Sequence, residues 1–202
     1  DVYLDEGAFT RDEAARILGA AKAEGLAVRA HVGQFADLGG AELAAQLGAL
    51  SADHLEHVSD EGLRAMASAG VVAVLLPGAW RTLRQTPPDA ARMRRFGVAI
   101  AVGTDCNPGT SPCVDLPLMA SLAVRDAGLT PEEALLAVTR VAAKAAGFAD
   151  AGRLRDATLV ERRAELEALD GFRAEVLRNL GSHRFKYAGE FETKLEAHLD
   201  GL

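Results

Sequence analysis

Hydrophobic and polar residues follow a pattern that occurs four times along this chain: an amphipathic helix, a glycine and a short apolar strand. The first helix is predicted to begin after Thr10, because Glu13 follows three residues later and completes a capping box. Gly25 ends this helix, since glycine tolerates the left-handed conformation found there. Residues 26–32 then form the first predicted strand.

Three further helices and strands continue the pattern. The helices are expected near 41–47, from 59 to 70 with Ser59 as the cap, and near 89–96, and the strands at 50–55, 71–76 and 98–102. The last two strands are apolar throughout, as strands covered on both faces are. Strands and helices that alternate at this spacing predict a parallel α/β sheet with right-handed crossovers.

Two closures of this predicted sheet compete. A doubly wound sheet usually carries a glycine-rich phosphate loop after its first strand, and His31-Val32-Gly33-Gln34 is not one. A (β/α)8 barrel instead places its chemistry at the carboxyl ends of several strands. His31, His54 and Asp105 stand at three such ends, so the sequence predicts a TIM-type barrel. Only four strands are apparent, and the chain is therefore expected to supply half of it.

His31, His54 and Asp105 are also residues from which a metal site can be built, because imidazole and carboxylate groups bind zinc or iron. Each has an ordinary structural alternative. A histidine at a strand end is often only hydrogen-bonded, and an aspartate there often stabilises a turn. Spacing alone leaves both interpretations open.

The segment 103–112 follows the last predicted strand. Two prolines and two glycines fix it as an irregular loop. Its backbone amides, the Asn107 amide and the Thr110 hydroxyl suit a carboxylate group. Rigidity alone is the alternative explanation, although loops over the mouth of a barrel usually carry substrate contacts.

Composition narrows the class of protein. The 202 residues are 49% hydrophobic and 25% charged, which suits one globular domain with or without a tail. A net charge of -7 argues against nucleic-acid and acidic-membrane partners, which require a basic surface. No apolar run approaches the roughly 20 residues that cross a bilayer, and no secretory signal is visible. Cys106 and Cys113 are expected to be reduced thiols, so a cytoplasmic location is predicted.

Six stretches of the chain match one known family. They are Asp1-Val2-Tyr3 with Glu6-Gly7-Ala8-Phe9, Gly39-Gly40-Ala41-Glu42-Leu43, Ser51-Ala52-Asp53-His54-Leu55-Glu56, Val72-Ala73-Val74-Leu75-Leu76-Pro77-Gly78, Thr104-Asp105-Cys106-Asn107-Pro108-Gly109-Thr110-Ser111-Pro112 and Leu129-Thr130-Pro131-Glu132-Glu133-Ala134-Leu135. These stretches resemble imidazolonepropionase, the metal-dependent amidohydrolase of histidine degradation. The resemblance covers roughly residues 1–148, and its Asp-Cys-Asn-Pro-Gly-Thr stretch is specific to this family.

The resemblance implies half of an amidohydrolase barrel, with strands equivalent to the fifth to eighth. His31 would be a ligand of one divalent metal ion, zinc or iron, from the fifth strand, and Asp105 would be the ligand from the eighth. Asp105 would also take a proton from metal-activated water. His54, on the sixth strand, would orient that water or polarise the carbonyl of the substrate ring.

Substrate contacts are implied in the same way. Gln34, Asn107, Gly109 and Thr110 would bind the substrate, including its propionate arm. The reaction would be the hydrolytic ring opening of 4-imidazolone-5-propanoate to N-formimidoyl-L-glutamate. The expected partners are this small molecule and either a second copy of the chain or a complementing chain, because open sheet edges must be paired or covered.

Three departures from the family pattern matter. The first-strand His-x-His pair, which supplies two metal ligands, is absent from the sequence. Gly33 stands where the family usually has a glutamate, and the small β-domain that normally follows the barrel is not recognisable. Two alternatives therefore stay open: a non-catalytic half-barrel that assembles through its sheet edges, and an amidohydrolase that acts on another cyclic amide.

The predicted domain organisation has two parts. Residues 1–148 form the amidohydrolase half-barrel, and residues 149–202 form a helical tail of unknown role. The tail is predicted from apolar residues that recur at helical spacing, among them Leu166, Leu169, Phe172, Val176, Leu177 and Leu180.

Overall fold

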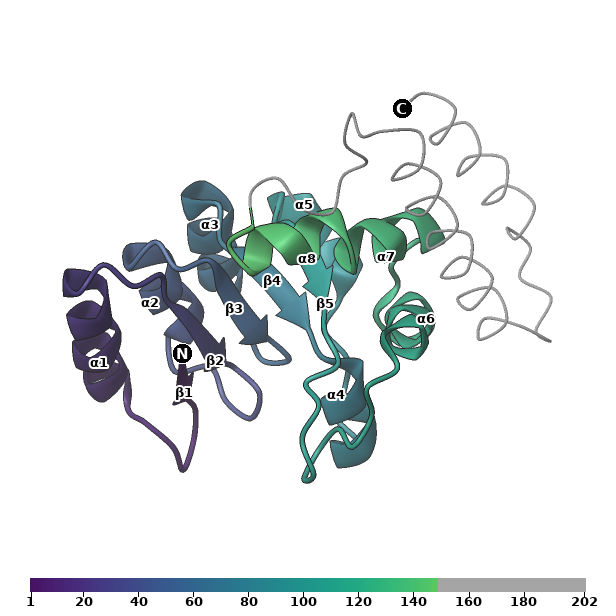
Figure 1. The fold of residues 1–202 in the computed structure, drawn as a ribbon, viewed down its shortest axis with the longest axis horizontal. Coiled ribbons are helices and arrows are strands. Elements are labelled where there is room, and N and C mark those ends of the chain that lie inside the picture. Colours follow the sequence, from purple (N-terminus) through teal and green to yellow (C-terminus); the bar gives the residue numbers. More distant parts are fainter. Residues whose placement is uncertain (149–202) are drawn as a thin grey trace, which may run out of the picture.

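The computed structural model describes residues 1–148 as five strands and eight helices (Figure 1). The strands are β1 (Val2–Leu4), β2 (Arg29–Val32), β3 (Ser51–His54), β4 (Val72–Leu75) and β5 (Ile100–Val102). The helices are α1 (Arg11–Ala23), α2 (Gly40–Gln46), α3 (Asp60–Ala69), α4 (Pro77–Leu83), α5 (Ala90–Phe96), α6 (Leu116–Ala127), α7 (Pro131–Ala137) and α8 (Arg140–Ala145). The predicted helical tail lies outside the described residues.

All five strands are parallel, and each pairs with its neighbour in the sequence, so that the sheet has the order β1-β2-β3-β4-β5. A doubly wound sheet reverses its strand order part-way across, and this sheet does not. The observed order is the one in which every crossover advances by one strand, as in a barrel. The predicted parallel α/β sheet is therefore confirmed.

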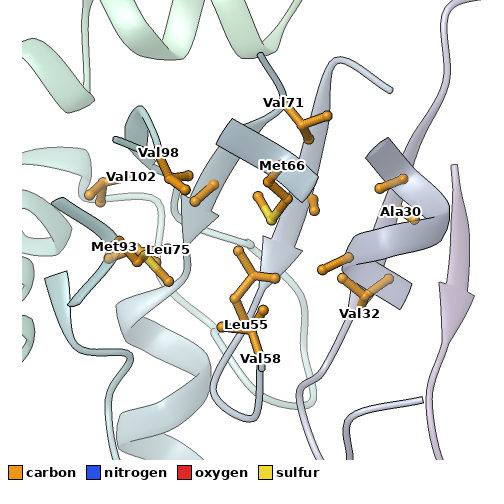
Figure 2. Close-up of a cluster of buried hydrophobic side chains, with 14 of the residues drawn as sticks. Ala30, Val32, Leu55, Val58, Met66, Val71, Leu75, Met93, Val98 and Val102 are labelled. Carbon is orange, nitrogen blue, oxygen red and sulfur yellow. The ribbon is translucent and has the colours of Figure 1, made fainter. Parts of the chain in front are cut away.

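The sheet is covered on both faces where its strands are most apolar. On β4, Ala73 and Leu75 belong to the main core, whereas Val72 and Val74 pack in a second cluster with α8. Figure 2 shows part of the main core, where Met66 of α3 lies among side chains of the strands. Two covered faces explain why these strands show no alternation of apolar and polar residues.

The predicted helix signals act as expected. Thr10 and Glu13 form the capping box of α1, with each side chain bonded to the backbone amide of the other residue. The side chains of Ser59 and Asp89 accept hydrogen bonds at the first turns of α3 and α5. Gly97 follows α5 with a φ of +75°, the left-handed conformation that favours glycine.

The prediction of four strands was wrong, because β1 adds a fifth. Its three residues are too few for periodicity to be recognised, and only their pairing with β2 identifies them as a strand. Helices α4, α6, α7 and α8 were not predicted either, although Asp115 and Thr130 cap α6 and α7 in the ordinary way. No helix within residues 1–148 is long and apolar enough to cross a membrane.

Candidate functional site

A row of register partners crosses one face of the sheet and carries its polar side chains. Tyr3 on β1 pairs with His31 on β2, and His31 pairs with Asp53 on β3. The same row continues through Val74 and Ala101, where α8 covers the sheet. The polar part of this face therefore lies on β1 to β3.

His31 is the centre of the polar row. Its side chain is half-buried, and its Nδ1 lies 3.1 Å from Oδ1 of Asp1. One ligand atom each from Asp1, His31 and Asp53 lies within 4.8 Å of the others, which is a spacing that one metal ion can bridge. Asp105, the predicted second ligand, is not a member of this group of described residues.

His54 approaches His31 from the neighbouring strand. The ring centroids of the two histidines are 5.3 Å apart. His54 is 3% exposed, and its Nδ1 has no hydrogen-bond partner among the described residues. Burial, together with the nearby His31, lowers the pKa of His54 to about 4, so the ring is neutral at pH 7. The predicted catalytic residue is thus placed beside the predicted metal ligand.

Two buried carboxyl groups complete this part of the site, and both were absent from the predicted site residues. Burial raises the pKa of Asp53, and burial raises that of Glu56 to about 8, with Asp5 and Asp105 nearby adding to the effect on Glu56. The Glu56 side chain is 1% exposed, and neither of its oxygens bonds another described residue. The signal for Glu56 was its position at the end of the same predicted strand as His54, whereas Asp53 lies inside a strand that also carries Ser51 and His54 and had no distinguishing signal.

Asp105 lies near the start of the predicted substrate loop, 103–112, and has a φ of +48°. It is half-buried, and burial raises its pKa, while His31 and the hydrogen bond from Asn107 act in the opposite direction.

Asn107 holds the loop together. Its Nδ2 donates to the backbone oxygen of Asp105 at 2.7 Å and lies 3.0 Å from Oγ1 of Thr110. Its Oδ1 accepts from the backbone amides of Gly109 at 2.9 Å and Thr110 at 2.7 Å. The structure therefore brings Asp105, Asn107, Gly109 and Thr110 into one turn, in which the polar atoms of Asn107 are bonded within the loop.

Gln34 lies in the loop after β2, apart from the Asn107 turn in sequence. It is 5% exposed, and its Oε1 accepts a hydrogen bond of 2.9 Å from the hydroxyl of Tyr3. The buried Asp5 fixes the same loop, because its carboxylate accepts from the backbone amides of Gln34 at 2.6 Å, Phe35 at 3.1 Å and Ala36 at 3.0 Å. The loop that carries Gln34 is thus pre-organised by a residue that follows β1.

The donor set fits a divalent metal ion. Imidazole and carboxylate groups are the ligands that zinc and iron accept. Oδ1 of Asp53, Nδ1 of His54 and both oxygens of Glu56 are buried without a partner among the described residues. Buried polar atoms are ordinarily satisfied, so this concentration of unsatisfied atoms beside His31 marks a place that is built for a ligand.

Residues 5–156, well over half of the chain, match the model of the Amidohydrolase family. The chain belongs to the amidohydrolase family. Among curated proteins, this amidohydrolase is 53% identical over 163 residues to imidazolonepropionase of Acidiphilium cryptum (strain JF-5). The aligned region covers 77% of this chain and 41% of that protein. It is 52% identical over 149 residues to imidazolonepropionase of Geobacillus kaustophilus (strain HTA426), covering 74% of this chain and 35% of that protein. The chain therefore spans about two fifths of the length of these relatives.

Solved structures share the amidohydrolase fold. An adenosine deaminase from Xanthomonas campestris with bound zinc superposes with a TM-score of 0.63 at 21% identity, over 73% of this chain and 39% of that one. The A. niger ochratoxinase gives a TM-score of 0.56 at 24% identity, over 74% of this chain and 38% of that one. At these identities the likeness concerns the fold, and it agrees with the family assignment.

Proposed function

We propose that this chain carries part of an imidazolonepropionase active site and that the complete enzyme opens the ring of 4-imidazolone-5-propanoate by hydrolysis to N-formimidoyl-L-glutamate. The identity of about 50% to curated imidazolonepropionases supports this proposal most strongly. The cytoplasm is the proposed location, in agreement with two cysteines that form no disulfide.

The architecture we infer is half of a (β/α)8 barrel. Strands β2 to β5 would be the fifth to eighth strands, and β1 would be the fourth. The sequential strand order and the polar residues at the carboxyl ends of the strands support this inference. The open edges at β1 and β5 would be closed by the remaining strands, supplied by a complementing chain or a second copy.

His31 and Asp105 would hold one divalent ion, zinc or iron, which when bound would activate water and polarise a carbonyl group as a Lewis acid. Asp105 would accept the proton of the attacking water, because its carboxylate is half-buried in the loop that follows β5. His54 is neutral at pH 7 and would act as a hydrogen-bonding group rather than as a cation.

The loop beyond β5 would receive the propionate arm of the substrate. Asn107 organises the backbone of this loop, and Gly109 and Thr110 would then offer groups to a carboxylate. Gln34 would contribute from the loop after β2, which Asp5 holds in place. Asn107 would therefore contribute to substrate binding as much by fixing the shape of the loop as by contacting the substrate directly.

Gly33 favours a second candidate, hydrolysis of a different cyclic amide. The family's glutamate is missing at this position, although a Cβ there would meet only ordinary contacts, at 3.7 Å from the Val58 nitrogen and 3.8 Å from Leu55 Cα. Its φ of +67° would strain a side chain by about 1 kcal/mol or slightly more. Space is therefore available for a glutamate side chain at position 33. Gly33→Glu can test whether restoring the family's carboxylate restores hydrolysis of 4-imidazolone-5-propanoate.

A chimera tests the proposed function. Residues 1–148 of this chain would replace the matching part of the Acidiphilium cryptum relative, so that the missing strands and ligands are present. Hydrolysis of 4-imidazolone-5-propanoate is expected, with loss in Asp105→Ala and retention in His57→Ala, an exposed control. A folded chimera that stays inactive with and without Gly33→Glu would refute the proposal, and activity on another cyclic amide would support the second candidate.

A further inference from the structure

The loop that carries Gln34 receives a hydrogen bond from a distant part of the chain. Nε2 of Gln85, which lies just beyond α4, donates to the backbone oxygen of Gln34 at 2.7 Å. The two residues are 51 positions apart in the sequence, so this bond joins the end of α4 to the loop after β2. Because a carbonyl oxygen can only accept, the Gln85 amide has to face it with its nitrogen.

Gln34 is held by hydrogen bonds to three other residues. Its backbone amide donates to Oδ2 of Asp5 at 2.6 Å, and its Oε1 accepts from the hydroxyl of Tyr3 at 2.9 Å. The bond from Gln85 to its backbone oxygen is the third. Among residues 1–148, its Nε2 has no hydrogen-bond partner, and this atom does not belong to the fully buried unpartnered atoms. The side-chain nitrogen is therefore the group that Gln34 keeps for a ligand.

The end of α4 fixes the backbone of Gln85. Arg84 has a φ of +58° at the position where a helix usually has glycine. Beyond this residue, the backbone amide of Gln85 donates to the oxygen of Trp80 at 2.9 Å. Trp80 is buried in the main core, and Arg81 makes two hydrogen bonds of 2.6 and 2.8 Å to Asp126 of α6. The Gln85 side chain thus extends from a helix end that is itself anchored.

We infer that Gln85 is a positioning residue: by donating to the backbone of Gln34, it sets the place at which the side-chain nitrogen of Gln34 meets the substrate. The inference rests on the proposed function for the role of Gln34 in substrate binding. Gln85 acts through Gln34, so its contribution disappears when the Gln34 side chain is removed.

A role in stability alone does not account for this side chain. Oε1 of Gln85 is buried without a partner among the described residues, so the amide makes one bond and leaves one acceptor unsatisfied. An unsatisfied buried group offsets much of what a single hydrogen bond contributes. Gln85→Met removes both, and the Gln34 oxygen that loses its donor is a carbonyl, which native proteins leave unpaired more readily than an amide. This variant should therefore be much more stable than Asp5→Ala.

Side-chain amide spectra of the chain alone test the contact. The sequence contains three glutamines, Gln34, Gln46 and Gln85, so 15N-glutamine labelling gives three NH2 signal pairs, each assigned by its loss on substitution by Met. We expect a lower 1H–15N NOE for the Gln34 pair in Gln85→Met than in the wild type. Gln46→Met is the matched control, because Gln46 is bonded to Arg11 instead and should leave the Gln34 pair unchanged.

Kinetics of the chimera test the role. Gln85→Met should lower kcat/KM by about tenfold, the upper range of what one hydrogen bond is worth. In a Gln34→Met background the same substitution should have no further effect, because the two changes act on one group. Gln46→Met should match the unsubstituted chimera in both backgrounds.

Three results would overturn the inference: a Gln34 pair as ordered in Gln85→Met as in the wild type, equal losses of kcat/KM in both backgrounds, or a Gln85→Met chain that is as unstable as Asp5→Ala or does not fold. The last would assign Gln85 a structural role. The spectra need no substrate, so a Gln34 pair that loosens in Gln85→Met beside an inactive chimera would support the contact and count against the proposed function alone.

Discussion

His31 and His54 come from adjacent strands and place their rings 5.3 Å apart, although they are not register partners. His31 pairs with Asp53, and His54 pairs with Val32, which points into the main core. Strict alternation along β3 would direct His54 away from His31. The left-handed backbone at His54, with a φ of +78°, is the feature that departs from this alternation at the end of the strand.

This backbone conformation predicts unequal effects for two substitutions at His54. Asn tolerates a positive φ, whereas a β-branched residue does not. Relative to His54→Asn, we expect His54→Val to lower the free energy of unfolding by about 1–3 kcal/mol. Urea denaturation of both variants measures this difference, and equal stabilities would show that the conformation of residue 54 costs the chain nothing.

Gly78 controls the position of the Asp105 loop. A Cβ on Gly78 would stand 1.9 Å from Oγ of Ser111, the hydroxyl that donates to the backbone oxygen of Thr104. Gly78→Ala should therefore displace the loop and destabilise the chain by about 1–3 kcal/mol, as overpacking does.

Gly19, in the middle of α1, is the matched control because a Cβ there meets nothing within 4 Å. Gly19→Ala should stabilise the chain by up to about 1 kcal/mol through helix propensity. Thermal unfolding compares the two variants. A Gly78→Ala protein as stable as the wild type would argue that the loop is not held against α4.

Asp5 is expected to be the residue on which the Gln34 loop depends. It is 2% exposed, and removing it by Asp5→Ala would leave the backbone amides of Gln34, Phe35 and Ala36 without their acceptor. A loss of about 3 kcal/mol in unfolding free energy is expected, because bonds to a buried charge are strong. Asp5→Asn keeps one oxygen acceptor and should lose less. Hydrogen exchange of these three amides would rise in both variants, and unchanged exchange in Asp5→Ala would contradict the assignment.

Glu56 makes stability depend on pH in a predictable direction. Its pKa is about 8 in the folded chain and near its ordinary value of 4.5 when unfolded, so the folded state binds the extra proton between these values. Stability therefore falls as pH rises through this interval, by about 1.4 kcal/mol for each pH unit. His54, with its lowered pKa, acts in the opposite sense and only below its ordinary value of 6.5.

The window from pH 6.5 to 8 isolates Glu56 from His54. Over this range the wild type should lose about 2 kcal/mol relative to Glu56→Gln, which cannot ionise. Denaturation at both pH values, with a chelator present, gives the comparison directly. Parallel pH profiles for the two proteins would mean that Glu56 is ionised at neutral pH.

The sequence predicted much of this fold because its signals are local. The caps at Thr10 and Ser59 and the glycines after the helices act within one turn, so short-range chemistry is enough to locate them. The apolar runs of β4 and β5 likewise indicated that both faces of the sheet are covered there. β1 was not predicted because its three residues are recognisable as a strand only through their pairing with β2.

The sequence was enough to predict which strand ends carry the candidate site residues, but not which of their side chains lie close together. His31, His54 and Asp105 were predicted as site residues because each stands at or just beyond the carboxyl end of a strand, and position in the sequence is sufficient for that inference. The contact between Glu56 and His54 depends on two consecutive left-handed residues, His54 and Leu55. The role of Asp53 depends on strand register, which a single sequence does not determine.

The central claim is that His31 and Asp105 belong to one metal site, and metal content per chain tests it most directly. The chimera, which supplies the strands and ligands that this chain lacks, would be incubated with zinc or iron(II), freed of excess ion and analysed for bound metal, beside its Asp105→Ala variant and the exposed control His57→Ala. The account predicts near-stoichiometric metal in the wild type and the control, and its loss in Asp105→Ala with the fold retained. Unchanged metal in Asp105→Ala would contradict it and would assign the ion to the Asp1, His31 and Asp53 group instead.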